Sequence, residues 1–70
     1  ISNEPIRLYI NTEGGSLTDG FAIYDAIKNI DSPVVGIVSG ICASAGLIIL
    51  AACDYRMCTD NSIFFFPTRK

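Results

Sequence analysis

The stretch Gly40–Gly46, which reads GICASAG, decides how the rest of the chain is interpreted. It follows a β-like run, Pro33–Val38, and precedes an apolar, helix-like run, Leu47–Cys53. A serine between two alanines, with a glycine two positions later, is therefore expected at a strand-to-helix turn. The unpaired N–H groups at the start of a helix carry partial positive charge, so negative charge that develops beside Ser44 would be stabilised. The alternative interpretation is that Ser44 only caps the helix.

Length and composition indicate part of a larger structure. The chain has 70 residues, of which 50% are hydrophobic and only 17% are charged. A chain of this length makes at most one small domain, and a free-standing small domain must show much of its surface to water. The composition is too apolar for a disordered segment. We therefore expect a single partial domain over residues 1–70, with its core in about residues 6–66, inside a larger fold or covered by neighbouring subunits.

Several functional classes are disfavoured by the same composition. The net charge is −2 and the five basic residues are scattered, so nothing indicates a nucleic-acid partner. There is no histidine and there are three cysteines without a C-x-x-C spacing, so we expect neither a metal site nor a cofactor. The cysteines are interpreted as small buried thiols in a reducing cytoplasm. The most apolar stretch, residues 41–53, is shorter than the roughly 20 residues of a membrane span, and the N-terminus does not resemble a signal peptide.

The remaining segments alternate between strand and helix patterns. Residues Ile6–Asn11 read as a mostly buried strand, and Leu17–Asn29 as a helix that begins with a capping-box spacing at Ser16–Asp19. The helix carries one apolar stripe, made of Leu17, Phe21, Tyr24, Ile27 and Ile30. After the central stretch, Asp54–Cys58 and Ile63–Phe66 read as two further strands. The order β-α-β-α-β-β predicts an α/β fold with a mainly parallel sheet.

A glycine pair, Gly14-Gly15, follows the first predicted strand. In a parallel sheet the loops that leave the carboxyl ends of neighbouring strands face the same crevice. The backbone N–H groups of Gly15 and Ala45 could therefore converge on one oxygen, as in an acyl-transfer site. A tight turn and a phosphate-binding loop are the alternatives for the pair, although neither common phosphate-loop motif is present.

Taken together, these motifs resemble those of Clp-type serine peptidases, the ClpP family. The resemblance extends from Ile6 to about Phe66 and rests on the order and spacing of the following runs: Leu8-Tyr9-Ile10-Asn11, Gly14-Gly15-Ser16, Ala22-Ile23-Tyr24-Asp25, Ala43-Ser44-Ala45-Gly46 and Asp60-Asn61-Ser62. Crotonase-fold enzymes belong to the same superfamily, and their pattern is echoed by residues 50–56 and by Phe66-Pro67.

The resemblance implies a ClpP/crotonase-like spiral of ββα units, of which this chain would be a partial fold. It implies that Ser44 is the catalytic nucleophile, that Gly15 and Ala45 supply the oxyanion-hole N–H groups, and that Gly14, Gly15 and Ser16 form the substrate-binding loop. The substrate would be a peptide or unfolded protein added as a strand beside this loop. Family members assemble as stacked heptameric rings and work with ATP-driven unfoldases, which implies a homo-oligomer with such a partner.

The chain departs from the family pattern at the position of the general base. An ungapped match places Pro67 where the family has its catalytic histidine, a one-residue shift places Phe66 there, and no residue matches the family's aspartate. A serine hydroxyl is a weak nucleophile without a positioned base. The chain as given is therefore expected to be inactive alone. It would be a fragment or frameshifted product, an inactive relative kept for assembly, or an enzyme that uses a lysine, Lys28 or Lys70, as base.

Three functions follow from these observations. The first is the core of an ATP-dependent Clp-type serine endopeptidase that hydrolyses peptide bonds when completed. The second is a non-catalytic assembly subunit with the same fold. The third is a crotonase-like acyl-CoA enzyme, in which two backbone N–H groups hold a thioester oxygen. Ser44 favours the first over the third, because crotonases usually need a small, non-nucleophilic residue at that position.

Overall fold

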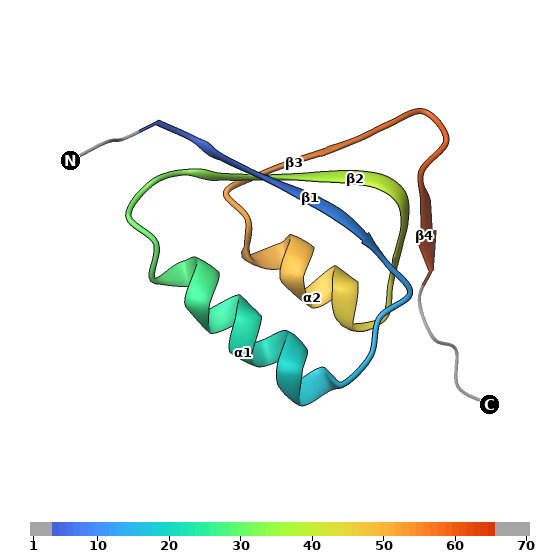
Figure 1. Cartoon of the computed structure of the whole chain (residues 1–70), viewed down its shortest axis with the longest axis horizontal. Coiled ribbons are helices and arrows are strands. Elements are labelled where there is room, and N and C mark those ends of the chain that lie inside the picture. Colours follow the sequence, from blue (N-terminus) through green and yellow to red (C-terminus); the bar gives the residue numbers. More distant parts are fainter. Residues whose placement is uncertain (1–3, 66–70) are drawn as a thin grey trace.

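The computed structural model describes residues 4–65, which form an α/β unit with two helices against one sheet (Figure 1). Its elements are, in chain order, β1 (Ile6–Thr12), α1 (Leu17–Lys28), β2 (Val34–Ala43), α2 (Ala45–Ala52), β3 (Tyr55–Cys58) and β4 (Ile63–Phe65). This is the predicted β-α-β-α-β-β order. The predicted last strand included Phe66, which lies outside the described residues.

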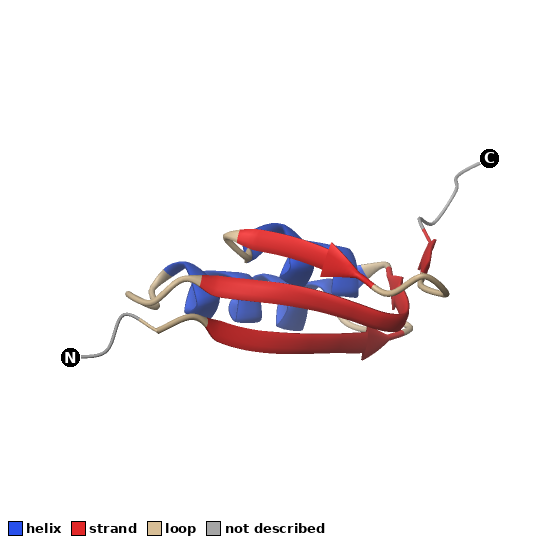
Figure 2. Cartoon of the chain, turned by 90° about the horizontal axis from the view of Figure 1, so that it is seen from above, coloured by secondary structure: helices blue, strands red, loops and turns tan. Residues whose placement is uncertain are grey.

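The sheet is parallel throughout the described pairings, with β2 at its centre. β1 pairs with one edge of β2, and β3 pairs with residues 35–38 of β2. β4 pairs with the last three residues of β2, from Ile41 to Ala43. Both helices lie on the same side of the sheet (Figure 2). A parallel sheet with right-handed crossovers places consecutive helices on one face in this way.

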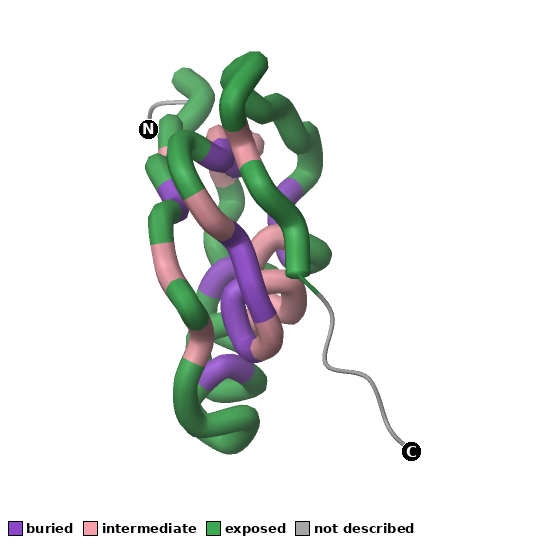
Figure 3. The backbone as a smooth tube through the Cα atoms, turned by 90° about the vertical axis from the view of Figure 1, so that its right-hand side faces the viewer, coloured by how far each residue is buried: buried purple, intermediate pink, exposed green. Residues whose placement is uncertain are grey.

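The core lies between β2 and the helices, and Figure 3 shows buried residues gathered towards the middle of the molecule. Val34 and Val38 on β2 are 1% and 0% exposed, because alternate residues of a strand point to the same face. α2 contacts α1, β1 and β2. A helix enclosed on several sides has no polar stripe, which explains its sequence AGLIILAA.

Two predicted burial patterns hold only in part. β1 was expected to be mostly buried, but only Ile10 is buried within the described chain, because the helices cover one face of the sheet. On the predicted α1 stripe, Ile27 is buried and Tyr24 packs against the core, but Leu17 and Phe21 are each 56% exposed. α1 approaches α2 through Gly20, where a Cβ atom would lie 3.2 Å from the Cβ of Ala45. The contact with the start of α2 is therefore made through a glycine, which hydrophobic periodicity does not detect.

The central strand is longer than predicted. The sequence predicted a strand over Pro33–Val38 and a turn at residues 40–46, but β2 continues to Ala43 and α2 begins at Ala45. Residues 41–43 of this extension pair with β4, and Cys42 also pairs with Thr12 of β1. The strand-to-helix turn thus consists of a single residue, Ser44.

Candidate active site

Ser44 occupies a strained backbone conformation between β2 and α2. Its φ is 53° and its ψ is −118°, and it is the only non-glycine residue with positive φ among residues 4–65. Such conformations cost an L-residue about 1–3 kcal/mol and persist only where the surroundings impose them. Ser44 stands at the N-cap position of α2, but its side chain makes no cap hydrogen bond. The interpretation of Ser44 as only a helix cap is therefore not supported.

Backbone contacts on both sides hold the turn. The N–H of Ser44 donates to the Phe65 carbonyl at 3.2 Å, which ties the turn to the end of β4. The carbonyl of Ser44 accepts from the Leu47 N–H at 2.9 Å, in the first turn of α2. Ser44 itself is half-buried. The hydroxyl is thus carried on a rigid backbone without serving to close the helix.

The glycine loop lies directly against this turn. Gly14 has φ of 106°, and a Cβ atom built on it would lie 2.8 Å from the Ser44 Cβ, 2.8 Å from the Ala43 carbonyl oxygen and 3.2 Å from the Ala45 nitrogen. Only glycine fits this backbone angle and this separation. The structure therefore brings together the two segments that the sequence predicted to meet.

The predicted oxyanion donors occupy different surroundings. Ala45 is 5% exposed and is the first residue of α2, so its N–H precedes the intrahelical hydrogen-bond ladder. Gly15 is exposed, and a Cβ atom on it would meet nothing within 4 Å. Gly15 follows Gly14, which contacts the Ser44 turn, and both glycines line the same cavity. The role of either N–H group in binding an oxyanion stays a prediction.

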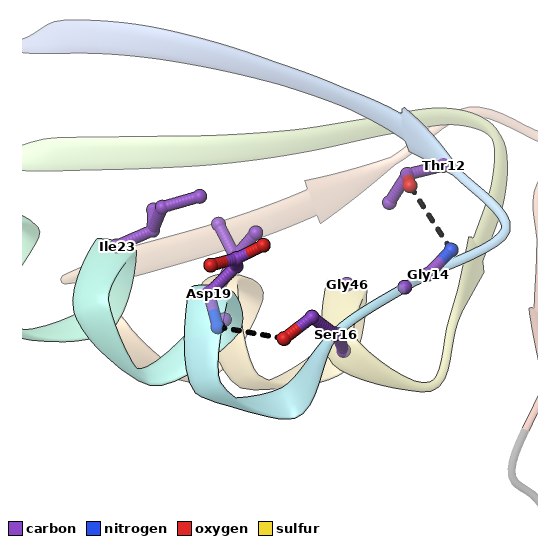
Figure 4. A pocket seen from close by; sticks show the side chains of 10 residues that line it. Thr12, Gly14, Ser16, Asp19, Ile23 and Gly46 are labelled. Carbon is purple, nitrogen blue, oxygen red and sulfur yellow. Dashed lines mark hydrogen bonds between the residues drawn. The ribbon is translucent and has the colours of Figure 1, made fainter.

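Ser16 has a defined structural role. It is the N-cap of α1, and its Oγ accepts from the Asp19 N–H at 3.2 Å (Figure 4). This confirms the helix start that the capping-box spacing predicted. A role for Ser16 in contacting substrate stays a prediction.

A cavity of about 240 Å³ opens beside the turn, between the glycine loop, the start of α1 and the start of α2 (Figure 4). Its wall includes Gly14, Gly15, Asp19, Ala45 and Gly46, with other residues from β1, α1 and α2. The side chain of Ser44 is not part of this wall. The expected crevice is therefore adjacent to Ser44 and begins at the next residue, Ala45.

Thr12 is a site residue that sequence reasoning missed. Its Oγ1 accepts from the Gly14 N–H at 3.0 Å (Figure 4), and its Cγ2 packs where a Cβ on Gly46 would lie, 2.5 Å away. Thr12 thus joins the glycine loop to the first turn of α2. A hydroxyl residue directly after the predicted strand, two positions before the glycine pair, is the signal that could have identified it.

Lys28, one of the two lysines considered as general base, lies away from the Ser44 turn. Lys28 lies in the last turn of α1, while the first turn of that helix adjoins the glycine loop. A helix of 12 residues is about 18 Å long, so Lys28 is too distant to accept a proton from Ser44. Lys70 lies outside the described residues.

The cysteines do not offer a second nucleophile at the turn. Cys42 and Cys53 are buried free thiols, as predicted, and burial raises the pKa of both, whereas Cys58 is exposed and its predicted burial is wrong. For Cys53, Asp54 adds to this rise while Arg56 opposes it. The raised pKa keeps both thiols protonated at neutral pH. Among residues 4–65 no group of histidine, cysteine or acidic side chains is arranged to hold a metal ion, and no helix there is long and apolar enough to cross a membrane.

Comparison with known proteins assigns the chain to a protein family. The family model described as Clp protease matches residues 1–66. The chain belongs to the Clp protease family. The recognition made from the sequence motifs is thereby confirmed, and so is the α/β fold class that it implied.

Relatives of this Clp protease family chain agree with that assignment. It is 55% identical over 51 residues to the ATP-dependent Clp protease proteolytic subunit 2 of Prochlorococcus marinus, a match that covers 73% of this chain and 25% of that protein. An equal identity, over 73% of this chain and 26% of the relative, links it to the proteolytic subunit 3 of a Synechococcus species. The chain thus spans about a quarter of the length of these relatives.

A solved structure shows the same fold. A mutant ClpP1 from Listeria monocytogenes superposes with a TM-score of 0.83 at 38% identity, and the match covers 87% of this chain and 37% of that one.

Proposed function

We propose that this chain carries the nucleophile and the oxyanion hole of a Clp-type serine endopeptidase core. In this proposal Ser44 Oγ attacks the carbonyl carbon of a peptide bond, and the N–H groups of Gly15 and Ala45 stabilise the oxyanion that forms. The observation that carries the proposal is the strained turn at Ser44, pressed against Gly14 and free of any capping role. Strain of this kind is concentrated at functional sites.

The proton of the Ser44 hydroxyl needs an acceptor. The sequence has no histidine, and Lys28 lies in the last turn of α1, away from the glycine loop. Loss of one member of a catalytic triad leaves only about 10³–10⁴-fold catalysis over water, from binding and the oxyanion hole. We therefore propose that the chain is inactive alone, and that a base must be supplied to complete the site.

Partners and location form part of the same proposal. The relatives are named proteolytic subunits of ATP-dependent proteases, which supports peptide or unfolded-protein substrates, a homo-oligomer arranged as stacked rings, and an ATP-driven unfoldase partner. Large apolar side chains stay exposed in this chain, including Phe21 at 56% and Met57 at 59%, which suits cover by other subunits. Three free cysteines suit a reducing cytoplasm.

One observation favours a second function. The absence of histidine from the sequence suits a non-catalytic assembly subunit, in which the Ser44 turn is kept as structure only. The two functions differ in one property, because only the first requires the Ser44 hydroxyl to react when a base is present. The family match gives no support to the acyl-CoA alternative.

The test is the rate at which a fluorophosphonate probe labels Ser44. We expect slow labelling of the unchanged chain and faster labelling of a Pro67→His variant, which restores a base at the position where the family pattern has one. General-base assistance of this kind typically contributes about 10²–10⁴-fold when well positioned. Adding Ser44→Ala to Pro67→His should abolish the labelling. Adding Ser39→Ala, which removes an exposed serine of β2, should leave the labelling intact.

Each outcome of this test decides between the functions. Fast labelling of the unchanged chain, abolished by Ser44→Ala, would contradict the proposed inactivity. No gain in both Pro67→His and Phe66→His would contradict the nucleophile proposal and favour the assembly subunit.

A further inference from the structure

The pairing of β1 with β2 changes register just before the Ser44 turn. From Ile6↔Val34 to Ile10↔Val38 the two strands advance together, but Thr12 pairs with Cys42. One residue of β1, Asn11, therefore spans three residues of β2, from Ser39 to Ile41. An excess of residues on one strand makes that strand bulge and bend. The bend divides β2 into a part paired with β3 and a part paired with β4.

The side chain of Asn11 fills the gap in the ladder. Its Oδ1 accepts from the Ile41 N–H at 3.1 Å and so replaces the main-chain acceptor that the register change removes. Gly40, inside the bulge, has φ of 108°, and a Cβ atom on it would lie 2.5 Å from Asn11 Oδ1. The bulge therefore requires glycine at position 40, where the amide of Asn11 approaches the backbone.

The segment after the bulge is the one that carries the serine. Residues 41–43 pair with β4, and the Ser44 N–H then donates to the carbonyl of the last β4 residue, Phe65, at 3.2 Å. The direction in which β2 leaves the bulge fixes both contacts. The hydrogen bond from the Ile41 N–H to Asn11 Oδ1 lies at the start of that segment.

We propose that Asn11 is a positioning residue for Ser44. It holds the β2 bulge so that residues 41–43 meet β4 and Ser44 meets the glycine loop, and it has no contact with reacting atoms. The inference rests on the proposed function for its catalytic consequence, but its structural content can be tested without any activity.

The structural test is amide hydrogen exchange, measured residue by residue by NMR in the full chain. Asn11→Ala removes one hydrogen bond, so we expect exchange of the Ile41 and Ser44 amides to rise about fivefold relative to amides in residues 35–38 of β2. Asn29→Ala is the matched control, because Asn29 Nδ2 makes one exposed hydrogen bond to the Asp25 carbonyl at 3.0 Å, far along α1. This control should not change the ratio.

The pattern of amide exchange across β2 distinguishes a positioning role for Asn11 from a general contribution to stability. A merely structural role would accelerate all protected amides by a common factor. Asn11→Asp keeps the acceptor oxygen and should preserve the wild-type ratio, which provides a second test if Asn11→Ala does not fold. Two results would overturn the inference. One is equal acceleration of all protected amides in Asn11→Ala. The other is a fivefold rise, in Asn11→Asp, of Ser44 amide exchange relative to residues 35–38.

The catalytic consequence is measured in the Pro67→His background. Asn11→Ala should lower the maximal rate of fluorophosphonate labelling about fivefold, while the half-saturating probe concentration stays unchanged, and Asn11→Asp should restore the rate. A change in half-saturation alone would overturn the positioning role. If Pro67→His with intact Asn11 does not label, the proposed function fails, and the exchange experiment still decides whether Asn11 positions Ser44.

Discussion

The turn around Ser44 and the outer surface of the same chain differ in how closely their residues are packed. On β2, Val38 and Cys42 are 0% exposed, and glycines at positions 14 and 46 let neighbouring segments approach within contact distance. On the open side of the sheet, Tyr9 and Tyr55 are 67% and 63% exposed. Contacts within residues 4–65 therefore shape the backbone of the Ser44 turn, whereas large apolar side chains at the periphery are uncovered in this part of the chain.

The sharpest way to break this comparison is substitution in the glycine loop. In Gly14→Ala, the added Cβ would lie 2.8 Å from the Ala43 carbonyl oxygen, at a φ of 106°. Left-handed backbone costs an L-residue about 1–2 kcal/mol and overpacking costs about 1–3 kcal/mol, so we expect the free energy of unfolding, measured in urea, to fall by about 2–5 kcal/mol. Gly15→Ala is the neighbouring control, since no atom lies within 4 Å of its added Cβ. Equal losses in both variants would contradict the close contact.

The next test compares a core residue with a surface residue of similar apolar character. Val38→Ala removes two methyl groups from a fully buried position, and we expect a loss of about 2–3 kcal/mol from the free energy of unfolding. Tyr9→Ser should change that free energy by less than about 0.5 kcal/mol. It should instead reduce self-association in sedimentation, because Tyr9 is 67% exposed. A large loss of stability in Tyr9→Ser would show that the open face is packed.

A smaller effect distinguishes the two serines at helix starts. Ser16 caps α1 through its Oγ, whereas Ser44 makes no cap hydrogen bond to α2. We expect Ser16→Ala to lower the free energy of unfolding by about 1 kcal/mol and Ser44→Ala by less than about 0.5 kcal/mol. Matched urea titrations of the two variants measure the difference. An equal loss would mean that Ser44 does serve as a cap.

The smallest expected effect is on pH dependence. Burial raises the pKa of the Cys42 and Cys53 thiols above 9.0 in the folded chain. As pH rises, these thiols therefore lose their protons in the unfolded chain before they do so in the folded chain. Their contribution to the free energy of unfolding is complete below about pH 9 and is lost as pH rises through the folded-state pKa. Urea midpoints should therefore decline above about pH 9, and Cys42→Ala should weaken that decline. An unchanged slope in that variant would contradict the contribution of Cys42.

Much of the fold was predictable because local patterns and tertiary structure agree. The short apolar run at residues 34–38 and the Ser16 cap gave the order of elements and the parallel sheet. The proximity of Gly14 to Ser44 was also predictable, because loops at the carboxyl ends of neighbouring parallel strands share one edge.

Other features depend on pairing that no local pattern contains. Residues 41–43 of β2 pair with β4, and Cys42 also pairs with Thr12 of β1, but the sequence shows only a stretch rich in small residues, which was interpreted as a turn. The side chain of Asn11 acquires its role from a register shift, which exists only between strands. The contact of α1 with Ala45 is made through Gly20, a residue that hydrophobic periodicity ignores.

The backbone angle at position 44 has a consequence for attempts to improve this protein. Glycine adopts a φ of 53° without steric conflict, so Ser44→Gly is expected to raise the free energy of unfolding by up to about 1–2 kcal/mol. A library selected for heat resistance alone would therefore discard the hydroxyl early. Selection for stability favours glycine at position 44, whereas selection for a reactive hydroxyl favours serine. A stabilised variant of this protein should therefore be selected with Ser44 kept unchanged.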